Sequence, residues 1–105
     1  MNASAEGGAS KLRYIEVTNA NHFDLYTNLL PANIVPLHVY LFRALDAMLA
    51  NLRSSAVALP PSQVVHTVPR VDNSTLITVA NVPPIAAAPG ADAITVSGTT
   101  VDVPN

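Results

Sequence analysis

The distribution of proline divides this sequence into two parts with different folding options. Seven of the nine prolines lie between Pro60 and Pro104. Proline has no N–H to donate, and its ring excludes it from helix interiors and from central strands. Residues 59–105 are therefore expected to form an extended, Pro-rich tail, whereas residues 1–58 are expected to hold a strand, a loop and one long helix.

The long helix is predicted over Pro36–Arg53. Proline is favoured in a first helical turn, and apolar residues follow at helical spacing to form one stripe. The stripe consists of Leu37, Leu41, Leu45 (or Ala44), Met48 and Leu52. Arg43 and Asp46 are three positions apart and can pair on the polar face. Because further apolar residues widen the stripe, this helix needs cover on more than one face.

Shorter elements surround this helix in the first part. Arg13–Thr18 contains mostly β-favouring residues and ends at an Asn-Ala-Asn turn signal, so a strand is predicted there. Asp24 is a suitable N-cap for a short helix over Leu25–Leu30.

In the tail, residues 59–70 are bounded by prolines and are expected to be extended. Leu76–Val79 has the composition of a strand. Ala93–Val103 shows valines and an isoleucine alternating on two arms around Ser97-Gly98, which predicts a terminal hairpin.

Composition excludes several classes of function. Charged residues are only 11 % of the chain, against a usual value of about 25 %. Five scattered basic residues do not form a nucleic-acid-binding patch. The absence of cysteine excludes disulfides and a thiol nucleophile. Prolines interrupt the longest uncharged stretches, so no membrane span is expected, and residues 1–10 lack the pattern of a signal peptide. Sparse charge and abundant apolar surface suggest a piece of a larger protein.

His22 is the candidate catalytic residue. It follows the predicted strand by four positions, and functional residues of open α/β sheets gather on loops at the carboxyl ends of strands. A histidine there can act as a general base near neutral pH, although a solvated loop histidine is the alternative interpretation. Asp24 is a poor orienting acid for it, because it lies only two positions away in the same loop. No serine has the flanking glycines of a nucleophile elbow.

The other two histidines carry weaker signals. His38 lies near the start of the long helix and is interpreted as an ordinary helix or interface residue. His66 lies in the Pro-bounded segment without an evident partner. The three histidines do not have the spacing of a zinc motif, and no Gly-rich phosphate loop is present, so neither a metal nor an organic cofactor is expected.

Four stretches together carry a family resemblance. Glu6–Asp24, Ile34–Leu52, Leu59–Arg70 and Asn81–Asn105 resemble the C-terminal end of the D-3-hydroxybutyrate oligomer hydrolases. The most specific parts are the segment YIEVTNANHFD and the helix start PLHVY.

The resemblance implies an α/β fold, as the C-terminal fragment of an α/β-hydrolase-like serine esterase that cleaves 3-hydroxybutyrate oligomers to monomer during polyhydroxybutyrate degradation. Arg13–Thr18 is then similar to a late core strand, and His22 to the triad histidine on the following loop. The resemblance also implies secretion to the extracellular space.

The nucleophile, the oxyanion hole and the acid of such an enzyme do not lie in these 105 residues. The chain alone is therefore expected to be inactive and to need the missing N-terminal catalytic core. The alternative is a non-catalytic binding module that docks on a partner through the Pro36–Arg53 helix. Another hydrolase, tannase-like or lipase-like, would share the histidine loop but not PLHVY or LPPSQVV.

Overall fold

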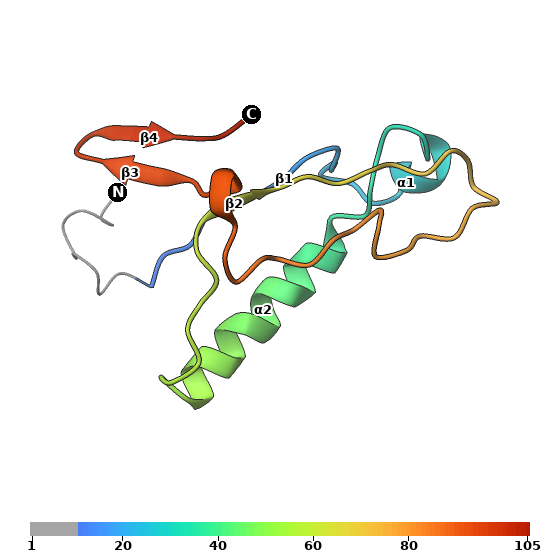
Figure 1. Ribbon diagram of the computed structural model, residues 1–105. Coiled ribbons are helices and arrows are strands. Elements are labelled where there is room, and N and C mark those ends of the chain that lie inside the picture. The colour runs from blue at the N-terminus through green and yellow to red at the C-terminus, as the bar shows by residue number, and fades with distance from the viewer. Residues whose placement is uncertain (1–10) are drawn as a thin grey trace.

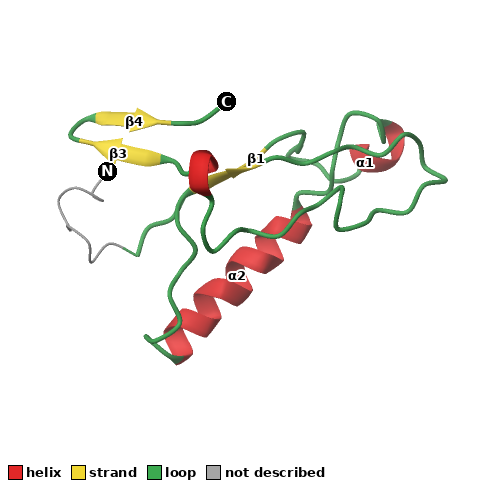
Figure 2. Cartoon of the chain, viewed as in Figure 1, coloured by secondary structure: helices red, strands yellow, loops and turns green. Residues whose placement is uncertain are grey.

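The computed structural model describes residues 11–105, and in them the chain forms a mixed α/β arrangement (Figures 1 and 2). One long helix lies beside a small parallel sheet, and a separate hairpin lies near the C-terminus. In chain order the elements are β1 (Ile15–Val17), α1 (Tyr26–Leu29), α2 (His38–Arg53), β2 (Gln63–Val65), the 3₁₀-helix η2 (Gly90–Asp92), β3 (Thr95–Ser97) and β4 (Thr100–Asp102).

The strands β1 and β2 form a two-stranded parallel sheet in which Glu16 is opposite Val64. A parallel pair needs a long crossover connection, and the segment that contains α1 and α2 supplies it. The expected strand over Arg13–Thr18 is present but covers only Ile15–Val17. Within residues 59–70, where only extended geometry was expected, Gln63–Val65 form a buried strand. The prolines lie before and after this strand, at positions 60, 61 and 69, so Gln63, Val64 and Val65 each keep a backbone N–H that can pair.

The hydrophobic core joins the two parts of the chain. It contains Val35, Tyr40, Val65 and Val82, with Ile15 and other apolar residues packed partly buried against it. Val35 and Tyr40 thus come from the first part, whereas Val65 of β2 and Val82 come from the tail. Since Tyr40 is only 3 % exposed and belongs to this core, it anchors α2 on the sheet.

The helix α2 begins at His38, two residues after the expected start at Pro36. Its first amides are bonded by the carboxylate of Asp24, which accepts hydrogen bonds from Leu37 N at 2.7 Å and His38 N at 3.0 Å. Asp24 was expected to cap a helix over Leu25–Leu30. That assignment is wrong: α1 is a single turn without a side-chain cap, and Asp24 caps the longer helix instead.

The apolar stripe of α2 is not the face that packs on the described chain. Leu41 is 56 % exposed, Met48 47 % and Leu52 67 %. The packed face holds Tyr40, whose hydroxyl donates to Pro83 O at 2.8 Å. Arg43, expected to pair with Asp46, donates instead to the carbonyls of Val82 and Pro83.

The tail follows the surface and ends in the predicted hairpin. β3 and β4 pair antiparallel, and Gly98 occupies the connecting turn with a φ of +59°, a conformation that glycine adopts without steric cost. The strand expected at Leu76–Val79 is absent, because these residues form a loop that contains a hydrogen-bonded turn, Asn81 N to Thr78 O. Within residues 11–105, neither helix is long and apolar enough to cross a membrane.

Candidate functional site

The loop that carries His22 is anchored where β1 ends. The amide of Asn19 donates to Thr67 O at 2.9 Å, and Thr67 N donates to the hydroxyl of Thr18 at 2.9 Å. Asn19 has a φ of 55°, which turns the chain sharply after the strand. These contacts tie the loop to the segment after β2, so its first residues have a defined position at the carboxyl end of both parallel strands.

His22 lies exposed on this loop. Its ring is edge-on to the ring of Phe23, with 4.7 Å between centroids, and Phe23 N donates to the side chain of Asn21. His22 borders a cleft of about 440 Å³ between β1 and the first half of α2, and Asp24 and His38 line the same cleft. The structure therefore brings the sequence-predicted histidine beside a second imidazole and a carboxylate.

Asp24 and His38 form the closest contact between polar side chains of the site. His38 Nδ1 lies 2.6 Å from Asp24 Oδ2, in addition to the two amide bonds that the carboxylate accepts. Partial burial raises the pKa of Asp24, but the hydrogen bonds from His38 and Leu37 outweigh burial and hold this pKa below its ordinary value. The carboxylate is thus ionised near neutral pH and joins the loop to α2.

The carboxylate of Asp24 therefore bonds to the His38 ring and to the first amides of α2. Within residues 11–105, no carboxylate forms a hydrogen bond with His22. The third histidine, His66, has its Nε2 3.4 Å from a carboxylate oxygen of Asp92, away from this cleft. The described residues contain no group of three or more metal-ligating side chains. The local chemistry is that of an exposed imidazole beside a fixed carboxylate–imidazole pair.

Sequence reasoning missed the pairing of Asp24 with His38. The two residues are 14 positions apart, on a loop and on a helix, and only the crossover between β1 and α2 brings them together. The signal that was available lies in the two specific segments of the sequence, HFD and PLHVY, which each contribute one partner.

Replacing Asp24 by Asn is expected to loosen the start of α2 by about 1 kcal/mol, the usual effect of losing a helix cap. The neutral amide of asparagine has one acceptor oxygen, whereas three groups (Leu37 N, His38 N and His38 Nδ1) bond to the carboxylate of Asp24. Amide hydrogen exchange at Leu37 and His38 measures this loosening. Because the folded pKa of Asp24 is lowered, its stabilisation is complete above the unfolded value near 3.9 and is lost as the pH falls through the folded value.

The pH dependence supplies the control for this variant. Exchange at Leu37 in the original chain should speed up below about pH 4, after correction for intrinsic exchange, whereas the Asn variant should show no such transition. A variant with the same protection as the original chain at pH 7 would show that Asp24 does not hold the helix.

Comparisons with known proteins identify relatives over the whole chain. The family model described as 3HB-oligomer hydrolase matches residues 1–105. The chain is 54 % identical to the D-(-)-3-hydroxybutyrate oligomer hydrolase of Cupriavidus metallidurans over 114 residues, which is 100 % of this chain and 16 % of that protein. It is 46 % identical to the protein of the same name from Paraburkholderia xenovorans over 110 residues, covering 100 % of this chain and 15 % of the relative.

These relatives are much longer than the matched region, so the chain spans about one sixth of their length. No solved structure matches this chain. The match of the family model to every residue, together with the identity to these relatives, shows that the chain belongs to the 3HB-oligomer hydrolase family.

Proposed function

We propose that this chain is the part of a 3-hydroxybutyrate oligomer hydrolase that supplies its catalytic histidine, His22. The observation that carries the proposal is the position of His22: it borders a cleft on the loop directly after β1, at the carboxyl end of a parallel strand. The succession β1–α2–β2 is consistent with an α/β-hydrolase-like core, in which such loops hold catalytic groups.

The proposed chemistry is ester hydrolysis through an acyl-enzyme. The relatives are named for hydroxybutyrate oligomers, whose units are joined by ester bonds. His22 accepts the proton of a serine hydroxyl as the oxygen attacks the ester carbonyl, and then donates that proton to the departing alcohol. Water, deprotonated by the same imidazole, cleaves the acyl-enzyme to the free acid. The serine and the acid that orients His22 come from the rest of the family polypeptide.

Asp24 and His38 have a positioning role in this proposal. The carboxylate of Asp24 connects the His22 loop to the first turn of α2 by three hydrogen bonds. Because Asp24 is only two positions after His22, these bonds restrict the movement of His22. The same geometry supports a second candidate. An imidazole bonded through Nδ1 to a carboxylate is the arrangement of a catalytic base, so His38 is the rival to His22.

The test uses a hybrid protein, in which this chain replaces the matching 114 residues of the Cupriavidus metallidurans relative. The hybrid is expected to hydrolyse the linear dimer of D-3-hydroxybutyrate. The isolated chain, and the relative with the matching stretch deleted, should release no monomer. Hydrolysis by the isolated chain that disappears on replacing His22 would contradict the proposed dependence on the rest of the polypeptide. A folded but inactive hybrid would favour a non-catalytic docking module.

A further inference from the structure

The two edges of the β1–β2 sheet are covered differently. On the outer side of β2, Ile94 N donates to Ser62 O at 2.9 Å and Ala93 forms a bridge with Gln63. At the two ends of β1, Tyr14 O accepts a hydrogen bond from Gln63 N, and Thr18 N donates to Val65 O. The backbone N–H and C=O groups of the even-numbered residues therefore point toward β2.

Backbone groups of successive strand residues point to opposite edges. The N–H and C=O groups of Ile15 and Val17 therefore point away from β2. Among residues 11–105 no segment pairs with them, so the sheet is open along Ile15–Val17. Just past the strand, Asn19 O accepts a hydrogen bond from Val35 N, which limits the open edge at that end. Such a row of unpaired groups is a template for one more strand.

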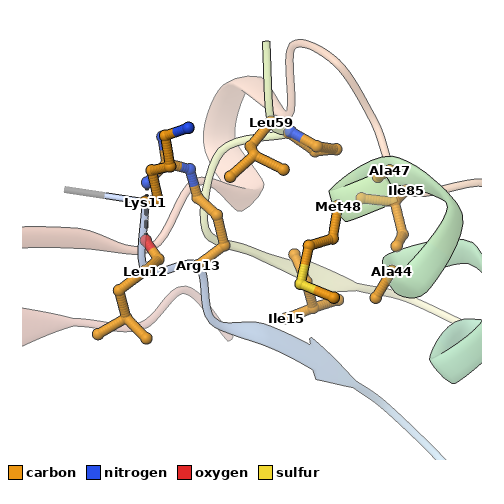
Figure 3. Close-up of a pocket in the computed structure, with 10 residues that line it drawn as sticks. Lys11, Leu12, Arg13, Ile15, Ala44, Ala47, Met48, Leu59 and Ile85 are labelled. Carbon is orange, nitrogen blue, oxygen red and sulfur yellow. Dashed lines mark hydrogen bonds between the residues drawn. The ribbon is translucent and has the colours of Figure 1, made fainter. Parts of the chain in front are cut away.

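Apolar clefts lie beside the open edge. A cleft of about 280 Å³ and the cleft of about 440 Å³ next to His22 share two lining residues, Ile15 and Ala44. Figure 3 shows the side chains of Ile15, Ala44, Met48 and Ile85 converging on the smaller cleft, between β1 and α2. The two clefts form a groove, which we call the β1–α2 groove, along one side of the strand.

The described chain exposes more large apolar residues than it buries, and some of the exposed ones line this groove. Six hydrophobic residues of the described chain are buried, whereas 22 large ones are exposed, and Leu41 and Met48 of the α2 stripe are among the latter. The Cα radius of gyration is 15.3 Å, against about 13 Å for a compact domain of this length. Both observations indicate a chain whose core is completed from outside.

We propose that an extended segment from the rest of the family polypeptide lies along β1, pairs with the backbone of Ile15 and Val17, and packs apolar side chains into the β1–α2 groove. About five sixths of each relative lies outside the matched region, so ample chain is present to occupy it. The proposal rests on family membership and on the open edge, and does not depend on the role of His22. Because His22 borders the same groove, the docked segment also brings the remaining polypeptide next to this loop.

Hydrogen exchange resolved to single amides tests the pairing. In the isolated chain the amides of Ile15 and Val17 should exchange at least about a hundredfold faster than in the hybrid, because an amide in a strand ladder exchanges only when the sheet opens. Thr18, which bonds to β2, serves as the internal control within the hybrid, where its protection should equal that of Val17. Val17 exchanging as fast in the hybrid as in the isolated chain, while Thr18 is protected, would overturn the proposal.

Crosslinking identifies the occupant. A benzophenone side chain at Leu41 of the hybrid should crosslink to residues outside the replaced stretch. Crosslinks from Leu41 to residues 1–10 or to a second copy of the chain would assign the groove to a different occupant and overturn the proposal. This result is independent of hydrolytic activity, so an inactive hybrid with the expected crosslink would reject only the proposed function.

Discussion

Replacing His22 by alanine in the hybrid is expected to lower kcat for hydrolysis of the hydroxybutyrate dimer by about 10²–10⁴-fold, the usual contribution of a general base. Without the imidazole, the serine hydroxyl keeps its proton at neutral pH and is a weak nucleophile. His22 is exposed and makes only an edge contact with Phe23, so its truncation should leave the fold intact. Monomer release under saturating substrate measures the effect.

Two further histidine variants make this experiment decisive. His38→Asn retains a side-chain N–H that can donate to Asp24, but it has no basic nitrogen. If His22 is the base, this variant should keep most of the activity. His66→Ala changes a histidine that lies beside Asp92 and does not line the cleft, so it should have no effect. If His38→Asn abolished hydrolysis while His22→Ala did not, the Asp24–His38 pair would be the catalytic base and the assignment of His22 would be wrong.

Replacing Gln63 by leucine is expected to destabilise the fold by about 3 kcal/mol. Gln63 is only 1 % exposed, and its amide group donates to Pro61 O and Ala86 O and accepts from Ala86 N at 2.8 Å. Leucine is similar in size but cannot form these hydrogen bonds. The partly buried backbone groups of Pro61 and Ala86 then lose their partners, at about 1–3 kcal/mol for each group left unsatisfied. The midpoint of urea unfolding, followed by circular dichroism, measures the loss.

Asn81→Leu is the matched control for this variant. Asn81 also uses its side-chain amide to bond backbone groups, donating to Val68 O and accepting from Thr78 N, but it lies in the solvent-exposed loop region. Water can replace the amide there, so its loss should cost under about 1 kcal/mol. Equal effects of the two substitutions would show that Gln63 does not hold the tail on the sheet.

Local patterns in the sequence were sufficient to predict the elements that form from neighbouring residues. The helix around residues 38–53 follows from apolar periodicity, and the terminal hairpin follows from alternating β-branched residues around Gly98. Leu76–Val79 has strand composition but no neighbouring strand, and without a partner it is a loop. Gln63–Val65 has neighbouring prolines but finds a partner in β1, and it is a buried strand.

The same distinction applies to the candidate site. His22 could be put forward as a candidate from its loop position and from family resemblance, because both are properties of a contiguous segment. The pairing of Asp24 with His38 could not, since it joins a loop to a helix 14 positions away and removes Asp24 from its expected local cap.

By itself the sequence determined the proline-restricted tail, the amphipathic helix, the hairpin and the histidine loop, because each depends on the intrinsic preferences of neighbouring residues. Only the tertiary structure decided that the tail supplies β2 to the strand at Ile15–Val17, and that Asp24 caps α2. It also decided that the α2 stripe stays exposed beside an open sheet edge. The physical reason is that strand pairing and burial depend on which distant segments meet, and so are properties of the assembled chain.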